Sequence, residues 1–143
     1  MSAKNLTCLS CGTINRVPDN RLSAKPKCGT CGQLLNTPKV TEIDATSLSK
    51  ASKRDQLPLV VDFWAPWCGP CRQMAPEFSN AATQMGTSVR FAKINTEDFP
   101  AVSQHHNIRG IPTLAMFKNG KEVARQSGVL RADQIKAWVE GHS

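Results

Sequence analysis

The pattern of apolar and polar positions changes near residue 40. Beyond that point, short apolar runs alternate with stretches in which apolar residues recur every three or four positions. This alternation predicts the strands and helices of an α/β domain. Before residue 36, large apolar residues are few and are separated by turn formers and charges, so burial alone cannot hold this segment together. We predict a small unit over residues 1–35, a linker over 36–40 and an α/β domain over 41–143.

The clearest element is the apolar run at residues 59–64, which predicts a strand buried on both faces. A long helix is expected to follow it, beginning near Cys68 and passing Met85. Asn119-Gly120 lies between two apolar runs and predicts a β-hairpin. The other expected elements are an edge strand at 40–43, a helix after Ser47, a strand at 89–94, a short helix from Pro100, and a weakly capped last helix ended by Gly141.

The net charge of +7 is unevenly distributed along the 143 residues. Residues 1–40 hold six lysines and arginines against one aspartate, a net charge of +5, which leaves +2 for the remainder. A basic segment attracts phosphate, but this one has no aromatic residue to stack on bases. A solvated basic surface or an acidic protein partner is therefore favoured over nucleic acid.

The chain has no apolar run long enough to span a bilayer, and its first residues lack the apolar core of a secretion signal. We therefore expect a cytoplasmic protein that does not use a membrane as a partner.

All six cysteines fall in three Cys-x-x-Cys pairs. In a reducing cytosol, such pairs favour metal binding or redox chemistry over structural disulfides. The first two pairs, Cys8/Cys11 and Cys28/Cys31, have the spacing of a four-thiolate zinc site. Zinc is favoured here over two disulfides or an iron site. We expect one structural Zn²⁺ and no organic cofactor bound by this chain.

The third pair, Cys68 and Cys71, comes directly after the buried strand and at the start of the long helix. Free N–H groups and the helix dipole lower the pKa of a thiol at that position. Cys68 is then the attacking thiolate, and Cys71, one turn further on, resolves the mixed disulfide. Asp62 lies inside the apolar strand, where a carboxylate is costly, and Lys93 is its candidate counter-charge. An aspartate that merely ends a strand is the alternative for Asp62.

Several segments match one family in the same order. The stretch Val-Asp-Phe-Trp-Ala-Pro-Trp-Cys-Gly-Pro-Cys at residues 61–71 resembles the active site of thioredoxins, and so do residues 75–76, 91–95, 110–113 and 117–121. The resemblance implies a thioredoxin fold, a central mixed sheet flanked by helices. With the small zinc ribbon placed before it, the whole chain resembles the zinc-carrying thioredoxins of bacteria, the thioredoxin 2 type.

The resemblance also assigns roles to residues. It implies Cys68 as nucleophile, Cys71 as resolving thiol, Asp62 as the buried proton-transfer group and Lys93 as its modulator. It implies a cis peptide bond before Pro112. The substrate-docking surface implied by the family comprises Trp67, Gly69, Pro70, Gly110, Ile111, Pro112, Gly128 and Val129. Because Gly69 and Pro70 add no positive charge beside the cysteines, the pair is expected to act as a reductant.

The function implied is that of a protein-disulfide reductase, re-reduced by an NADPH-dependent thioredoxin reductase. Its substrates would be disulfide-containing proteins. It would act as a monomer in redox homeostasis and in defence against oxidative stress. Two alternatives remain open at this point. One is a redox sensor based on the zinc thiolates, and the other is a nucleic-acid or protein adaptor that uses the thioredoxin domain as a scaffold.

Overall fold

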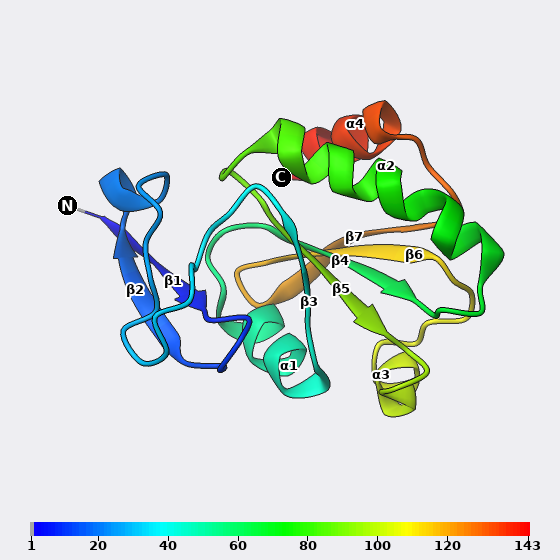
Figure 1. The fold of residues 1–143 in the computed structure, drawn as a ribbon, viewed down its shortest axis with the longest axis horizontal. Coiled ribbons are helices and arrows are strands. Elements are labelled where there is room, and N and C mark those ends of the chain that lie inside the picture. Colours follow the sequence, from blue (N-terminus) through cyan, green and yellow to red (C-terminus); the bar gives the residue numbers. More distant parts are fainter. Residues whose placement is uncertain (1) are drawn as a thin grey trace.

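The computed structural model describes residues 2–143 and contains two separate sheets (Figure 1). The N-terminal part holds a two-stranded sheet, and the remainder holds a five-stranded sheet with four helices. In chain order the elements are β1 (Ala3–Thr7), β2 (Ile14–Pro18), the 3₁₀ helix η1 (Asp19–Arg21), β3 (Val40–Glu42), α1 (Ala45–Arg54), β4 (Leu59–Trp64), α2 (Gly69–Met85), β5 (Arg90–Asn95), α3 (Pro100–His105), β6 (Thr113–Lys118), β7 (Lys121–Ser127) and α4 (Ala132–His142).

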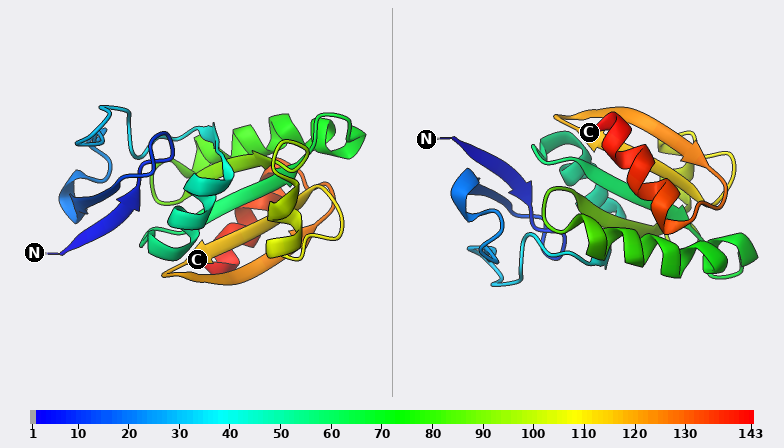
Figure 2. Two further views of the ribbon diagram at one scale, coloured as in Figure 1. Left: turned by 90° about the horizontal axis from the view of Figure 1, so that it is seen from below. Right: turned by 90° about the horizontal axis from the view of Figure 1, so that it is seen from above.

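The N-terminal unit is an antiparallel hairpin of β1 and β2 followed by a second turn that an isolated bridge between Lys27 and Leu34 closes. Its buried core is small, as its sequence predicts. Leu6, Val17 and Leu35 pack with two of the cysteines and with Leu57, which comes from the connection between α1 and β4. Figure 2 shows this unit, in blue, at one end of the molecule.

The five-stranded sheet has the order β3-β5-β4-β6-β7. β4 pairs in parallel with β5 and antiparallel with β6, so the sheet is mixed and β4 lies at its centre. This confirms the predicted central strand at residues 59–64 and the predicted edge strand that begins at Val40. The central position explains why β4 is apolar on both faces.

Alternation along β4 divides the core into two layers. Leu59, Val61 and Phe63 pack against α1 and α3 on one face of the sheet. Val60 packs against α2 and α4 on the other face. Figure 1 shows the same arrangement, with α2 and α4 on one side of the strands and α1 and α3 on the other. A helical layer therefore covers each face, as the predicted fold class requires.

Some boundaries differ from the sequence predictions. α1 begins at Ala45, before Ser47, because the side chain of Asp44 accepts a hydrogen bond from the Ser47 backbone N–H at 2.7 Å and caps the helix. α4 continues through Gly141 to His142. The Asn119-Gly120 turn is confirmed, with both residues at positive φ (52° and 84°). Across residues 2–143 we find no helix with the length and apolar character needed to cross a membrane.

Candidate active site and metal centre

The third cysteine pair lies at the junction between β4 and α2. Cys68 is the N-cap of α2, and its Sγ accepts a hydrogen bond from the backbone N–H of Cys71 at 3.2 Å. The two cysteines are joined by a disulfide, with their Cα atoms 5.2 Å apart. Cys68 and Cys71 are both buried in this form, and Cys68 is slightly more exposed. The predicted placement at a helix N-terminus, where a thiolate is stabilised, is thus observed.

The loop that leads into β6, the strand next to β4, lies against the pair. The Ile111–Pro112 peptide bond is cis, as the resemblance implies. Cys68 Sγ lies 3.8 Å from the Ile111 carbonyl oxygen. The Gly128 N–H donates to the Pro112 carbonyl at 2.9 Å, which holds the start of the β7–α4 connection beside this loop. The structure therefore brings Ile111, Pro112 and Gly128 together next to the disulfide.

The remaining residues of the expected docking surface surround the pair and are exposed. Trp67, directly before Cys68, exposes 66% of its surface, which is rare for a residue of its size. Val129 follows Gly128 and is 41% exposed. Gly69, Pro70 and Gly110 are exposed as well. An exposed apolar rim around a reactive pair suits contact with another protein chain.

Asp62 is the buried carboxyl group near the pair. It lies in the middle of β4, is 2% exposed, and its Oδ1 atom has no hydrogen-bond partner among the described residues. Burial raises its pKa from 3.8 to about 7, and Lys93 opposes that rise. Asp62 and Cys71 line the same cavity of about 450 Å³. A carboxyl group with this pKa, in a cavity shared with a thiol, can accept and return a proton at neutral pH.

Lys93 pairs in register with Asp62 on the neighbouring strand, but its ammonium group points to other partners. Lys93 Nζ lies 3.9 Å from a Glu42 carboxylate oxygen and 4.9 Å from the centre of the Trp64 ring. Within residues 2–143, no ion pair joins Lys93 to Asp62 directly. The predicted counter-charge therefore acts at longer range. The sequence analysis missed Glu42, which the pairing of β3 with β5 places opposite Lys93.

The first two cysteine pairs come together in the N-terminal unit. Their four Sγ atoms all lie within 4.8 Å of one another. Cys8 Sγ is 3.6 Å from Cys31 Sγ, and Cys11 Sγ is 3.7 Å from Cys28 Sγ. A tetrahedron of sulfurs about 2.3 Å from a zinc ion has edges of about 3.8 Å. The two printed separations match that edge, so the four clustered thiols suit a tetrahedral zinc ion.

Two matching turns aim backbone N–H groups at the sulfurs. Gly12 and Gly32 follow the second cysteine of each pair at φ values of +81° and +79°, where glycine is favoured. The N–H of Cys11 donates to Cys8 Sγ, and the N–H of Thr30 donates to Cys28 Sγ. Such hydrogen bonds favour the thiolate, the form that binds metal.

Asn15 is a residue of this centre that the sequence analysis missed. Its amide group donates to Cys28 Sγ at 3.4 Å and to the Thr13 carbonyl at 3.1 Å, while its oxygen accepts from the Gly29 N–H at 3.0 Å. Hydrogen bonds from the Cys31 backbone and from the Asn15 side chain lower the pKa of the Cys28 thiol to about 6. Asn15 thus joins the two turns and supports the charged form of Cys28.

Two adjacent histidines, His105 and His106, lie away from both sites. His105 ends α3 and is exposed, whereas His106 is half-buried between the rings of Phe63 and Phe117, each with a centroid 5.6 Å away. Burial lowers the pKa of His106. Neither histidine belongs to a metal-binding cluster within the described part of the chain.

Comparison with known proteins decides the family. The model of the thioredoxin family matches residues 39–141, which include the whole five-stranded sheet and the Cys68–Cys71 pair. The chain belongs to the thioredoxin family. A second family model, described as the N-terminal part of thioredoxin 2 and labelled a zinc ribbon, matches residues 7–33 and so covers the four clustered cysteines.

The similarity to curated thioredoxins extends over most of the chain. Thioredoxin C-3 of Corynebacterium nephridii is 42% identical over 135 residues, which cover 94% of this chain and 92% of that protein. The thioredoxin of Rhodospirillum rubrum is 47% identical over 58% of this chain and 80% of its own length. Among solved structures, a variant of thioredoxin from Halobacterium salinarum NRC-1 superposes with a TM-score of 0.65 at 29% identity, covering 73% of this chain and 91% of that one.

Family membership and the observed disulfide give the chemistry of the protein. It is a thiol-disulfide oxidoreductase of the protein-disulfide reductase class. The zinc-ribbon match and the four-cysteine cluster also indicate metal binding by the N-terminal unit. The six cysteines therefore separate into two groups, one redox and one metal-binding.

Proposed function

We propose that the protein reduces disulfides in other proteins with the Cys68/Cys71 dithiol, and that Asp62 moves the proton that this reaction requires. The observation that supports this proposal most directly is the cavity that Asp62 shares with Cys71, because it gives a buried base access to the resolving thiol. The exposed rim formed by Trp67 and Val129 supports a protein substrate over a small molecule.

The reaction transfers two electrons in two steps. The Cys68 thiolate attacks one sulfur of the substrate disulfide, forming a mixed disulfide and releasing the first substrate sulfur as a thiolate, which takes a proton from water. The Asp62 carboxylate accepts the Cys71 thiol proton, and the Cys71 thiolate attacks Cys68 Sγ. The second substrate thiolate leaves, and the Cys68–Cys71 disulfide forms. The substrate is reduced and the protein is oxidised by the same two electrons.

The helix position of Cys68 supports its role as the attacking sulfur. As N-cap of α2, it lies at the positive end of the helix dipole and accepts the Cys71 N–H bond. Gly69 and Pro70 add no charge between the cysteines, which supports a reducing pair over an oxidising one. The Ile111 carbonyl and cis Pro112 beside Cys68 would contact the substrate chain during the exchange.

A flavoprotein thioredoxin reductase using NADPH would return the oxidised protein to the dithiol form. The resemblance to thioredoxins, whose Cys-Gly-Pro-Cys pair this chain shares, supports that partner. We place the reaction in the cytoplasm, with the protein acting as a monomer in redox homeostasis and oxidative-stress defence.

The four remaining cysteines would hold one structural Zn²⁺. Bound ions of this kind supply the folding energy that a small core cannot, with apparent binding energies of roughly 10–16 kcal/mol in zinc-finger peptides. Bound thiolates are also withdrawn from disulfide exchange, which would keep Cys8, Cys11, Cys28 and Cys31 apart from the redox pair.

A turnover assay tests the proposal. Wild-type protein, NADPH, thioredoxin reductase and a disulfide-containing protein are mixed, and the oxidation of NADPH is followed by the loss of its absorbance. Wild type is expected to sustain turnover, and Cys68→Ser to lose it by at least about a thousandfold because the attacking sulfur is gone. Cys11→Ser, which removes an exposed thiol of the other group, is the matched control and should retain turnover. Equal rates for wild type and Cys68→Ser would refute the assignment.

A further inference from the structure

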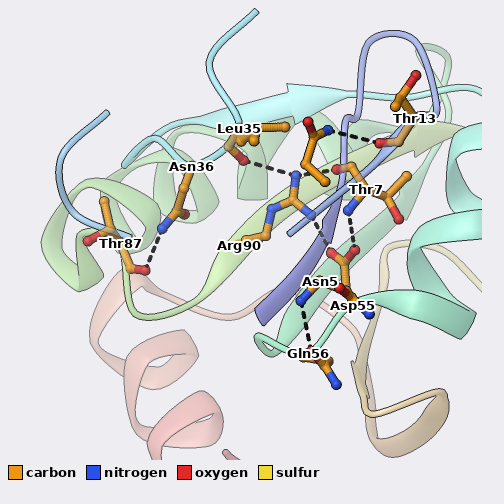
Figure 3. A network of polar contacts seen from close by, with 10 residues as sticks. Asn5, Thr7, Thr13, Leu35, Asn36, Asp55, Gln56, Thr87 and Arg90 are labelled. Carbon is orange, nitrogen blue, oxygen red and sulfur yellow. Dashed lines mark hydrogen bonds and ion pairs between the residues drawn. The ribbon is translucent and has the colours of Figure 1, made fainter. Parts of the chain in front are cut away.

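A buried ion pair of the thioredoxin domain is hydrogen-bonded to the N-terminal unit (Figure 3). Arg90, the first residue of β5, is 3% exposed, and Asp55, which follows the last turn of α1, is 2% exposed. A guanidinium N–H of Arg90 donates to Asp55 Oδ2. Both residues belong to the thioredoxin domain, at the end of the sheet that faces the N-terminal unit in Figure 1. This end is opposite the Cys68–Cys71 disulfide, which follows the other end of β4.

The other hydrogen bonds of this pair run to the N-terminal unit. Arg90 Nη2 donates to the Thr7 carbonyl at 2.7 Å and to the Leu35 carbonyl at 3.0 Å. Asp55 Oδ1 accepts from the Thr7 N–H at 2.7 Å. Thr7 directly precedes the first cysteine, Cys8, and Leu35 lies four residues after the last, Cys31. The pair therefore holds both ends of the segment that carries the four cysteines.

These contacts are needed as a set, because a buried charge is stable only while its hydrogen bonds are satisfied. Burial raises the pKa of Asp55, and Arg90 and the Thr7 N–H oppose that rise. If the N-terminal unit unfolds, Arg90 loses two carbonyl acceptors and Asp55 loses one donor. Each lost partner of a buried charged group destabilises the thioredoxin domain unless water replaces it.

The N-terminal unit depends on its metal, since its own core holds few apolar side chains. We propose that the Asp55–Arg90 pair couples metal binding at the four cysteines to the folding stability of the thioredoxin domain. This inference rests on the proposed zinc site. Coupling between two equilibria is reciprocal, so the pair must strengthen metal binding by the same factor by which the metal stabilises the domain.

The distribution of tryptophan provides a selective probe of this coupling. Trp64, Trp67 and Trp138 all lie in the thioredoxin domain, and residues 1–40 contain no aromatic side chain. Urea unfolding followed by tryptophan fluorescence therefore reports the thioredoxin domain alone. The full chain, kept reduced, is compared in its zinc-loaded form and after removal of zinc by a chelator, with the released metal measured by a colorimetric reagent.

The wild-type comparison is decisive by itself. The fluorescence midpoint is expected to fall to a lower urea concentration when zinc is removed. An unchanged midpoint, in protein from which one equivalent of zinc has been released, would overturn the coupling while leaving the metal site intact. If the full chain binds no zinc at all, the proposed metal centre fails, and the inference that rests on it fails too.

Neutral substitution of the pair then tests whether these two residues carry the effect. In Asp55→Asn/Arg90→Gln, the shift in midpoint on zinc removal should shrink, and zinc affinity measured by chelator competition should fall by about tenfold. An unchanged shift and an unchanged affinity in this variant would exclude the pair as the coupling element.

The chain offers a control pair with the same bonding pattern in a more exposed position. Arg125 also bonds to one carboxylate, that of Glu122, and to two backbone carbonyls, those of Asn107 and His106, but all of these lie within the thioredoxin domain. Glu122→Gln/Arg125→Gln should lower the midpoint of both metal states equally and leave zinc affinity at the wild-type value. A loss of zinc affinity in this control equal to that in Asp55→Asn/Arg90→Gln would show that general destabilisation accounts for the effect.

Discussion

Asp62 has an unsatisfied carboxylate oxygen in the centre of the sheet, and such a group destabilises the fold while it is charged. Its pKa of about 7, compared with 3.8 in water, reflects that cost. A residue retained for packing alone would avoid it. The proton-transfer role proposed for Asp62 beside Cys71, with which it shares a cavity, would account for this cost in stability.

Replacing Asp62 should therefore stabilise the protein and slow its reaction. Because the folded-state pKa is raised, the stability of wild type falls as the pH rises from about 4 through 7, and the full cost, at most about 4 kcal/mol, applies above pH 7. Asp62→Asn lacks this cost, so urea unfolding should show its stability advantage to be largest near pH 8.5 and smaller near pH 5.5. Disulfide reduction by the variant should be slower at neutral pH.

Asp133→Asn removes an exposed carboxylate and is the control for this measurement. Its stability relative to wild type should vary little between pH 5.5 and 8.5. If the advantage of Asp62→Asn is the same at both pH values, Asp62 does not carry a raised pKa.

Trp67 gives a second prediction for a single residue. With 66% of its surface exposed, it contributes little to the core, so Trp67→Ala should leave the urea midpoint nearly unchanged. Loss of a large apolar contact beside Cys68 should lower kcat/KM for a protein disulfide by about tenfold. Val123→Ala, at an exposed apolar position of β7, should leave kcat/KM unchanged. Wild-type kcat/KM in Trp67→Ala would remove this residue from the docking surface.

Local spacing allows the roles of the cysteines and Asp62 to be predicted from the sequence. The hydrogen-bond partners of Arg90 cannot be predicted in this way. A charged residue at the start of the apolar strand 89–94 signals that some partner is needed. Those partners, Asp55 and Thr7, lie 35 and 83 residues away in the chain. Only the folded arrangement of both units identifies them, and the same holds for the approach of Asn15 to Cys28.

At the scale of elements, helix starts are determined by side chains from neighbouring segments as well as by local capping residues. α4 lacks a side-chain cap at Arg131, as its sequence suggests. The Gln134 side chain instead accepts from the Arg131 N–H, and Glu77 of α2 accepts from the Ala132 N–H, both at 2.9 Å. The strands and helices of the α/β domain could be predicted from apolar periodicity, but β1, β2 and this long-range cap were not.

The two cysteine turns supply a prediction at this scale. Gly32 has a φ of +79° and open space around it, so Gly32→Ala adds backbone strain without a steric clash. The left-handed conformation costs an L-residue roughly 1–2 kcal/mol, and metal binding that requires this turn should weaken by about tenfold. Competition with a chelator measures the affinity. Gly29→Ala, in the same turn at an ordinary φ, is the control, and equal affinities in the two variants would contradict the account.

At the scale of the whole molecule, the two groups of cysteines belong to different units of the structure. The four metal-binding candidates belong to the N-terminal unit, near the starts of β4 and β5, while Cys68 and Cys71 follow the far end of β4 (Figure 1). Most of the net charge of +5 over residues 1–40 belongs to the N-terminal unit, but Lys39 lines the cavity that Asp62 and Cys71 share. The sequence distinguishes the groups by spacing and context, but only the fold shows their separation in space.

The division of the six cysteines is the central claim, and trapping the reaction intermediate tests it most directly. Cys71→Ser cannot resolve a mixed disulfide, so incubation of the zinc-loaded variant with a disulfide-containing protein should accumulate the covalent complex. Mass spectrometry, native for the metal and after digestion for the linkage, should find the substrate attached to Cys68 and one zinc ion retained per chain. Attachment to Cys8, Cys11, Cys28 or Cys31, or release of zinc as the complex forms, would contradict the account.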